Sequence, residues 1–349
     1  MRNILIISIL SAAVIMQLSC RAHAQNTRIK DGTQWAVVNV SDAFMREEPR
    51  YGSECVSQTR MGTLVQVLER KGYWVRIKTP EPYEGWVNEL ALAPTREIKP
   101  AEQKQTRLYG ATLRTMTSGE AGKYLRAPKM ICTGADPVKV FKAPPTDVPQ
   151  GLEVLTTLLQ GNIVRAKAGT GGMLEIVLPD GKTGFAPSSA FEDFSGWAEA
   201  EAAESDEEKA AQIVSLAKTF LGVPYLWGGM SPGHFDCSGL TGFCFFMNGL
   251  LLPRDASQQV KCGIEVPFDQ MQAGDLVFFG DTSVGHVALC IGDHKIIHAS
   301  QLVRINSLLP GEPGYYGRNI LHIRRIIGHL EDGELKAVKI KDSQHYNSL

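Results

Sequence analysis

Hydrophobic and polar residues alternate in short runs over much of the chain. Between residues 33 and 95 the runs QWAVVNV, LVQVLER, WVRIKT and YEGWVNEL are rich in Val, Ile, Trp and Tyr, and glycines separate them. An alternation of period two with turn residues at the breaks predicts the short strands of a small β-barrel, which we assign to residues 30–98.

The same pattern returns over residues 126–195, in PVKVFKAP, LLQGNIVRAKAG and GMLEIVLPDGKTGFAPSSAF. In both regions a strand precedes a glycine–aromatic corner, EGWV in the first and TGFA in the second. This weak internal repeat predicts a second small barrel. Residues 99–125 between the two barrels are predicted to be a linker.

After residue 195 the pattern becomes helical. The segment WAEAEAAESDEEKAAQIVSLAKTFLG predicts a helix with one apolar face, with Ser205 as its N-cap and Glu208 as the reciprocal capping partner. A second apolar helix follows Asp236 and ends at the NG pair at 248–249. From residue 274 onward strands dominate, so we expect an α+β domain over residues 205–333 and a tail over 334–349.

The composition excludes some classes of partner. A chain of 349 residues with 44% hydrophobic residues is long enough for two or three domains, each with its own core. The formal net charge of −1 argues against a nucleic-acid or acidic-lipid partner.

The first 24 residues differ from the rest. An apolar run from Ile4 to Met16 follows Arg2 and is short for a transmembrane helix, and small residues precede position 25. Residues 1–24 are therefore predicted to be a signal peptide of an exported protein. The alternative is lipid attachment at Cys20, which Gln17 disfavours.

Cys237 stands out among the cysteines. No C-x-x-C pair occurs, so a structural zinc site has little support. Cys55 and Cys132 can form a disulfide, which the sequence does not decide. Cys237, in contrast, has small polar neighbours and stands at the predicted start of the second helix, where the positive end of the helix dipole lowers a thiol pKa.

Two histidines are candidates for a base that activates Cys237. His286 begins one predicted strand and His298 ends the next, with the turn GDHK between them. A hairpin around this turn is predicted to bring them opposite each other, one as the base and the other as the group that orients it. Alternatively, each histidine is a surface or core residue.

Six motifs then show a resemblance to a known family. They are PYLWGG (224–229), FDCSGL (235–240), PRDASQQ (253–259), AGDLVFF (273–279), GHVALCIGD (285–293) and IIHAS (296–300). Over about residues 205–330 the chain resembles the NlpC/P60 cysteine peptidases, and both barrels resemble bacterial SH3 (SH3b) domains. The resemblance implies a papain-like α+β core in which Cys237 attacks, His286 is the general base and His298 orients it, with neither cofactor nor metal.

The family cuts peptides of bacterial cell walls. Two SH3b-like domains before the peptidase resemble a subgroup, the γ-D-glutamyl-L-diamino acid endopeptidases, which act on murein stem peptides with a free N-terminal L-Ala. This implies release of L-Ala-γ-D-Glu and a role in recycling, which we expect in the periplasm. The residues implied to contact substrate are Tyr225, Asp236, Ser238, Arg254, Asp255 and Ser257.

The resemblance also implies an acidic residue of the first SH3b domain that meets the substrate amine. Glu84 of YEGW is the best match, and either Tyr109 or Tyr124 assists. The Cys237 N–H and the Tyr225 hydroxyl are candidates for the oxyanion hole.

Three other interpretations remain open at the level of sequence. The protein is an endopeptidase or amidase that acts on intact peptidoglycan, or a non-catalytic SH3b wall-binding protein. A metal hydrolase that uses His234, His286 and His298 is a weaker third, because no H-x-x-x-H spacing occurs. Diaminopimelate and lysine as the third residue are not distinguished, and the oligomeric state stays open.

Overall fold

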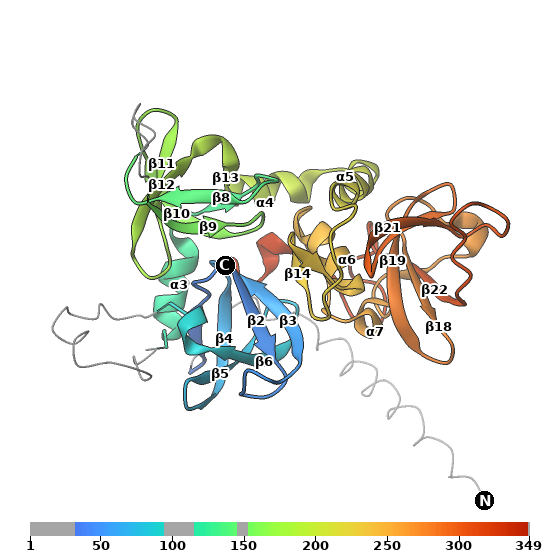
Figure 1. The fold of residues 1–349 in the computed structure, drawn as a ribbon, viewed down its shortest axis with the longest axis horizontal. Coiled ribbons are helices and arrows are strands. Elements are labelled where there is room, and N and C mark those ends of the chain that lie inside the picture. Colours follow the sequence, from blue (N-terminus) through green and yellow to red (C-terminus); the bar gives the residue numbers. More distant parts are fainter. Residues whose placement is uncertain (1–31, 94–114, 145–152, 348–349) are drawn as a thin grey trace, which may run out of the picture.

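The computed structural model describes residues 32–93, 115–144 and 153–347. The predicted signal peptide, Cys20 and Tyr109 lie outside these ranges. Figure 1 shows two β-rich domains beside each other and an α+β domain that packs against them. No helix in the described ranges is both long and apolar enough to span a membrane.

The first domain, residues 32–93, is a six-stranded antiparallel sheet with the order β1-β4-β5-β6-β2-β3. Its elements are β1 (Gln34–Val37), β2 (Asp42–Arg46), β3 (Cys55–Arg60), β4 (Leu64–Lys71), β5 (Trp74–Lys78), β6 (Glu84–Asn88) and the 3-10 helix η1 (Glu89–Ala91). Alternate residues of these strands point into one apolar core that includes Met45, Val75 and Ile77. The predicted alternation is therefore present in the fold.

The second domain, residues 130–193, repeats this architecture with a seven-stranded sheet, β13-β7-β10-β11-β12-β8-β9. Its elements are β7 (Met130–Cys132), β8 (Val138–Phe141), β9 (Val154–Leu158), β10 (Ile163–Ala168), β11 (Met173–Val177), β12 (Thr183–Pro187), η2 (Ser188–Ala190) and β13 (Phe191–Asp193). It contacts the first domain directly, since the Ile163 N–H donates to the Met61 carbonyl at 2.9 Å.

The segment 99–125 is not a linker throughout. Helix α3 (Ser118–Arg126) begins after Thr117, whose side chain and Glu120 form a capping box. Ala121 and Leu125 of this helix pack on Trp35 and Leu64 of the first domain. The described part of this segment therefore belongs to the packed structure.

The third domain, residues 194–339, places its helices before its main sheet, as predicted. Its helices are α4 (Phe194–Ala203), α5 (Asp206–Thr219), α6 (Cys237–Phe246), α7 (Ala256–Gln259) and η3 (Phe268–Gln270). Its strands are β14 (Met230–Ser231), β15 (His234–Phe235), β16 (Leu250–Leu251), β17 (Ile264–Glu265), β18 (Leu276–Gly280), β19 (Val284–Gly292), β20 (Lys295–Ser300), β21 (Leu302–Ser307), β22 (Ile320–Arg325) and β23 (Val338–Lys339). The Ser205–Glu208 capping box predicted for α5 is present.

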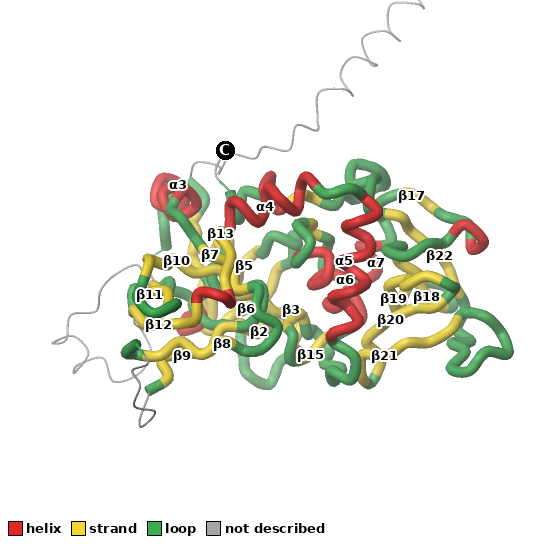
Figure 2. Tube along the Cα trace, turned by 90° about the horizontal axis from the view of Figure 1, so that it is seen from above, coloured by secondary structure: helices red, strands yellow, loops and turns green. Residues whose placement is uncertain are grey.

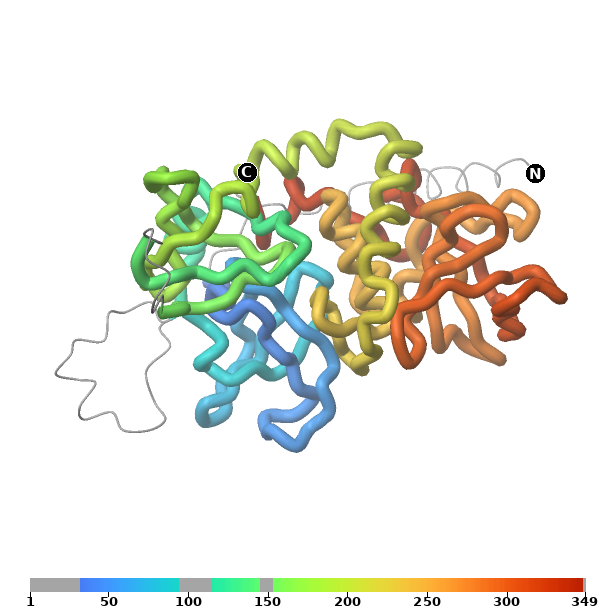
Figure 3. The backbone as a smooth tube through the Cα atoms, turned by 45° about the horizontal axis from the view of Figure 1, so that its top comes forward, coloured from blue at the N-terminus to red at the C-terminus, as the bar shows by residue number. Residues whose placement is uncertain are grey.

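A six-stranded sheet with the order β17-β22-β18-β19-β20-β21 forms the body of this domain. Helix α6 is buried along its whole length and packs against this sheet, with Phe243 in the same apolar cluster as Phe278 and Ile297. In the views of Figures 1, 2 and 3, α6 lies between the first domain and the sheet. The N-terminus of α6 is therefore held where two domains meet.

Residues 334–347 are packed and do not form a free tail. After η4 (Ile340–Asp342), His345 Nδ1 contacts the Leu64 carbonyl at 2.6 Å, and the Tyr346 hydroxyl lies 3.3 Å from the Thr63 hydroxyl. The Tyr346 ring also packs against Phe246 of α6, with the ring centroids 5.8 Å apart. This segment therefore joins the first domain to the third.

Candidate active site

Cys237 is the first residue of α6, as predicted. Asp236 caps the helix, and its carboxylate accepts from the Gly239 N–H at 2.6 Å. A Cβ atom at position 239 would stand 1.9 Å from the Gly229 carbonyl oxygen, so only glycine allows the first turn to pack this closely on the preceding loop. The local sequence thus fixes the direction in which Cys237 points.

The Cys237 thiol is 8% exposed, and its surroundings favour the protonated form. Burial raises its pKa to about 11, and the charge of Asp236 adds to this, while the Val287 and Ser238 N–H groups act in the opposite direction. The thiol therefore keeps its proton at neutral pH. A base must remove that proton during the reaction.

The two histidines meet, although not directly across the hairpin. The pairing of Leu289 with Ile297 places His298 opposite Ala288, so His286 lies diagonally from His298 on the same face of the sheet. His286 Nε2 is 2.7 Å from His298 Nδ1. The predicted pairing is confirmed, and the predicted register is two residues off.

Asn306 on β21 completes this chain of side chains and was missed in the sequence. Its Nδ2 donates to the Gly314 carbonyl at 2.7 Å, which turns its Oδ1 toward His298 Nε2 at 2.9 Å. His298 must therefore carry its proton on Nε2 and accept at Nδ1 from His286 Nε2–H. This order leaves Nδ1 of neutral His286 without a proton, as a base for Cys237 requires.

The surroundings also keep both histidines neutral. Burial lowers the pKa of His286 to about 3 and that of His298 to about 4. Tyr316 covers the pair, with its ring centroid 4.6 Å from that of His298 and 6.0 Å from that of His286. In the resting site the Cys237 thiol and both imidazoles are therefore neutral.

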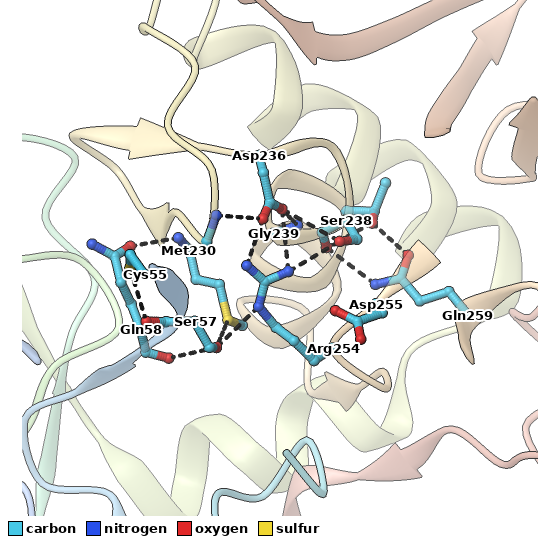
Figure 4. A network of polar contacts seen from close by, with 12 residues as sticks. Cys55, Ser57, Gln58, Met230, Asp236, Ser238, Gly239, Arg254, Asp255 and Gln259 are labelled. Atoms are coloured by element: carbon cyan, nitrogen blue, oxygen red, sulfur yellow. Dashed lines mark hydrogen bonds and ion pairs between the residues drawn. The ribbon is translucent and has the colours of Figure 1, made fainter. Parts of the chain in front are cut away.

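A buried ion pair holds the Cys237 turn (Figure 4). Arg254 Nη2 lies 2.6 Å from the Asp236 carboxylate, and Nη1 donates to the Ser238 hydroxyl at 3.0 Å. Arg254 Nε donates to the Ser57 hydroxyl of β3 in the first domain at 2.9 Å. Arg254 is 2% exposed, so it supports the site from below and does not line it.

A pocket of about 310 Å³ opens over Cys237, at the boundary between the first and third domains. Its walls come from the first domain, the loop before α6, the starts of α6 and α7, and the start of β19. The lining residues are Glu47, Glu54, Val56, Tyr83, Trp227, Asp236, Cys237, Ser238, Asp255, Ala256, Ser257, Val284 and Gly285. The structure therefore brings together four of the seven predicted substrate residues: Asp236, Ser238, Asp255 and Ser257.

Tyr225, Glu84 and Tyr124, which were also predicted to contact substrate, are not in the pocket lining. Tyr225 lies near Cys237: burial and then the charge of Cys237 raise its pKa to about 12. The prediction that Glu84 meets the substrate amine is corrected, because Glu84 lies on the outer face of β6 and pairs with Arg76 at 2.7 Å. The Tyr124 hydroxyl donates to the Gly62 carbonyl at 2.7 Å.

The acidic side chains that do face the pocket from the first domain are Glu47 and Glu54. Both lie in the turn between β2 and β3 and are exposed, and neither has an ion-pair partner among the described residues. Tyr83 joins them in the same wall. No sequence motif marks these residues, because their position depends on how the two domains dock.

The other cysteines and the third histidine lie apart from this site. The six described cysteines are all free, including Cys55 and Cys132, so the possible disulfide is not formed. His234 stacks on Phe44 and lies 3.9 Å from Asp42, at the first domain, and is not part of the histidine pair. No group of three His, Cys, Asp or Glu in the described ranges has the geometry of a metal site.

A cysteine at the start of a buried helix, together with a histidine pair on the sheet against which that helix packs, is the arrangement of papain-like cysteine peptidases. Comparison with family models specifies the class further. The model described as NlpC/P60 family matches residues 222–325, and that described as bacterial SH3 domain matches residues 41–92. The chain therefore contains an NlpC/P60 cysteine peptidase domain preceded by a bacterial SH3 domain.

Relatives extend this similarity beyond the two matched segments. A γ-D-glutamyl-L-lysine dipeptidyl-peptidase of Bacillus cereus is 26% identical over 74% of this chain and 72% of its own length. Dipeptidyl-peptidase 6 of Lysinibacillus sphaericus is 28% identical over 80% of this chain and 94% of its own. The Bacillus subtilis γ-D-glutamyl-L-lysine dipeptidyl-peptidase is 40% identical over 120 residues, and the alignment spans 40% of its length.

A solved structure is similar in fold over most of this chain. The crystal structure of an NlpC/P60 family protein from Bacillus cereus superposes with a TM-score of 0.62 over 84% of this chain and 99% of that one, at 22% identity. At 22% identity, the similarity between the two structures is evidence for the fold alone.

Proposed function

We propose that the protein is an exported, periplasmic γ-D-glutamyl-diamino acid endopeptidase that cleaves murein stem peptides with a free N-terminal L-Ala. The observation that carries the proposal is the wall of the pocket over Cys237. There Glu47 and Glu54 of the first domain face the nucleophile without a cationic partner among the described residues. An ammonium group is the ligand that such a pair of carboxylates favours.

The reaction follows from the order of protons in the site. His286 Nδ1 takes the thiol proton as the Cys237 sulfur attacks the γ-carbonyl carbon of D-Glu. The amide nitrogen on the tetrahedral carbon then receives that proton from His286, and the C–N bond breaks, which leaves a thioester on Cys237. Water, activated by His286, hydrolyses the thioester and releases L-Ala-γ-D-Glu.

The charge that develops on the carbonyl oxygen needs donors that are already in place. The N–H of Cys237 has no partner within α6 because it belongs to the first turn, and Tyr225 is close enough to Cys237 for the charge of Cys237 to contribute to its raised pKa. Tyr225 stays protonated at neutral pH, with a pKa raised to about 12 by burial, and can donate.

The placement of the first domain favours small peptides over intact wall. Glu47, Glu54 and Tyr83 of the first domain line the pocket over Cys237. With the amine of L-Ala bound at Glu47 and Glu54, a glycan strand attached to L-Ala would collide with this wall. The names of the relatives, γ-D-glutamyl-L-lysine dipeptidyl-peptidase and dipeptidyl-peptidase 6, agree with removal of a dipeptide.

The test compares L-Ala-γ-D-Glu-diaminopimelate with its N-acetylated form by mass spectrometry of the products. We expect release of L-Ala-γ-D-Glu from the free-amine peptide and little cleavage of the acetylated one. Glu47→Gln and Glu54→Gln should reduce this preference, while Glu84→Gln, a matched change on the outer face of the same domain, should not. Equal cleavage of both peptides would assign the enzyme to intact wall, and cleavage of neither would favour a binding protein. Cys237→Ala should abolish turnover without change in the fold.

A further inference from the structure

Two arginines beside the histidine pair have no counter-charge. The third domain contains five arginines, and three of them pair with carboxylates: Arg254 with Asp236 at 2.6 Å, Arg324 with Glu265 at 3.2 Å and Arg325 with Asp275 at 2.9 Å. Arg304 and Arg318 make no side-chain hydrogen bond or ion pair with any described residue. The Nε of Arg304 is buried and lacks a hydrogen-bond partner.

Both arginines are fixed near the histidines by the backbone. Arg304 is the direct cross-strand neighbour of His298 in the β20–β21 pair, so the two side chains share one face of the sheet. Arg318 follows Tyr316, which packs on both histidine rings, and the Arg318 N–H donates to the Tyr316 carbonyl at 2.9 Å. The acidic residue of the same loop, Glu312, accepts from the Ser307 hydroxyl instead.

The charges of the two arginines reach the site. Burial is the largest cause of the lowered pKa of both histidines, and His298 is the next cause for His286. The charges of Arg304 and Arg318 lower both pKa values further. Uncompensated cations at this place oppose the imidazolium that forms when Cys237 loses its proton. An anion bound between them would offset this effect during turnover.

The side of the cleft identifies the anion. The first domain and β21, which carries Arg304, lie on opposite sides of α6 (Figure 1). A substrate whose amine meets Glu47 and Glu54 and whose scissile bond lies at Cys237 would therefore extend toward β21. The leaving amine must lie next to His286, which protonates it. The arginines are therefore on the side of the leaving diamino acid.

We propose that Arg304 and Arg318 form a carboxylate-binding subsite for the leaving diamino acid. The subsite rests on the proposed function, and it explains how one cleft selects an ammonium at one end and a carboxylate at the other. The carboxylate is either the α-carboxylate, which lysine and diaminopimelate share, or the second carboxylate that diaminopimelate alone carries. Guanidinium groups bind carboxylates through charge-assisted hydrogen bonds of this kind.

Three substrates distinguish the α-carboxylate from the second carboxylate of diaminopimelate. They are L-Ala-γ-D-Glu-L-Lys amide, the same peptide with a free α-carboxylate, and L-Ala-γ-D-Glu-meso-diaminopimelate. For the wild-type enzyme we expect kcat/KM to be roughly tenfold higher for the first substrate in this series that carries the recognised carboxylate than for the substrate before it. Arg304→Gln and Arg318→Gln should each remove most of this rise, so that the ratio of kcat/KM between the carboxylate and amide substrates falls toward one. Arg304→Lys should keep part of it, and Arg324→Gln on β22, which pairs with β17 and β18, serves as the matched control.

Each outcome decides a different point. Loss of the rise at the α-carboxylate step or at the diaminopimelate step supports the subsite and identifies its ligand. An equal kcat/KM for all three peptides, or a rise that both glutamine variants retain, would overturn the subsite while the proposed function stands. If the wild-type enzyme cleaves none of the three, the proposed function fails and the subsite with it.

Discussion

The ion pair between Arg254 and Asp236 gives the sharpest test of how the site is held. Its N–O distance of 2.6 Å equals that of the pair between Arg50 and Glu48, but the side chains are 1% and 8% exposed in the first pair and 62% and 56% in the second. Removing one partner of a buried pair leaves an uncompensated buried charge, whereas an exposed pair is screened by water.

We expect Arg254→Met to lower the free energy of unfolding by about 3 kcal/mol, at the lower end of the range for a broken buried pair. The lower end applies because Asp236 keeps the Gly239 and Gly228 N–H groups, at 2.6 and 3.0 Å, as donors. Arg50→Met should cost no more than about 0.5 kcal/mol. Ser57→Ala, which removes one hydrogen bond to Arg254, should cost about 1 kcal/mol.

The measurement is urea unfolding followed by intrinsic fluorescence, with Asp236→Asn and the double variant to complete a cycle. The coupling energy between positions 236 and 254 should be about 2 kcal/mol, and kcat/KM should fall in both single variants because the Cys237 turn loses its support. A loss below about 1 kcal/mol for Arg254→Met, or two single changes that simply add, would refute the view that this pair holds the turn.

Two further predictions concern the protons of the site. Because burial raises the pKa of Cys237 to about 11, the rate of alkylation by iodoacetamide should climb about tenfold per pH unit from neutral pH upward; a plateau below pH 8 would instead indicate a preformed thiolate. Asn306→Ala should lower kcat by at least about tenfold because His298 loses the partner that fixes its tautomer. Asn306→Asp should restore much of the rate while moving the acid limb of the kcat/KM profile upward, and unchanged kinetics in the alanine variant would exclude this role.

Local signals in the sequence predicted local features well. The cap at Asp236, the Ser205–Glu208 capping box and the hairpin that joins the histidines depend on residues within a few positions of one another. The turn of that hairpin contains two residues of positive φ, Asp293 at 49° and His294 at 52°, as a two-residue turn requires. Each of these features is determined by residues that are close to it in the sequence.

Features that depend on domain docking were not predictable in this way. Glu84 was selected by its place in a motif, yet the alternation of β6 puts it on the outer face, while Glu47 and Glu54 reach the pocket from a turn. Arg254 was expected near the substrate, but a side chain of the first domain, Ser57, holds it below the pocket.

Asn306 shows an intermediate case. It lies in the run LVRINSL, which predicts a strand, and its polar side chain falls two positions after Arg304, on the face that carries His298. The signal was therefore a polar residue on the histidine face of the next strand. Recognising it required the register of β20 with β21, which the sequence does not specify.

The packing of residues 340–347 has a consequence for truncated forms of the chain. These residues dock between the first domain and α6, and the pocket over Cys237 needs a wall from that domain. Other contacts, such as that from Arg254 to Ser57, join the same two domains, and the terminal segment adds to them. A chain that ends before residue 340 would therefore keep its nucleophile but hold the enclosure that selects its substrate less firmly.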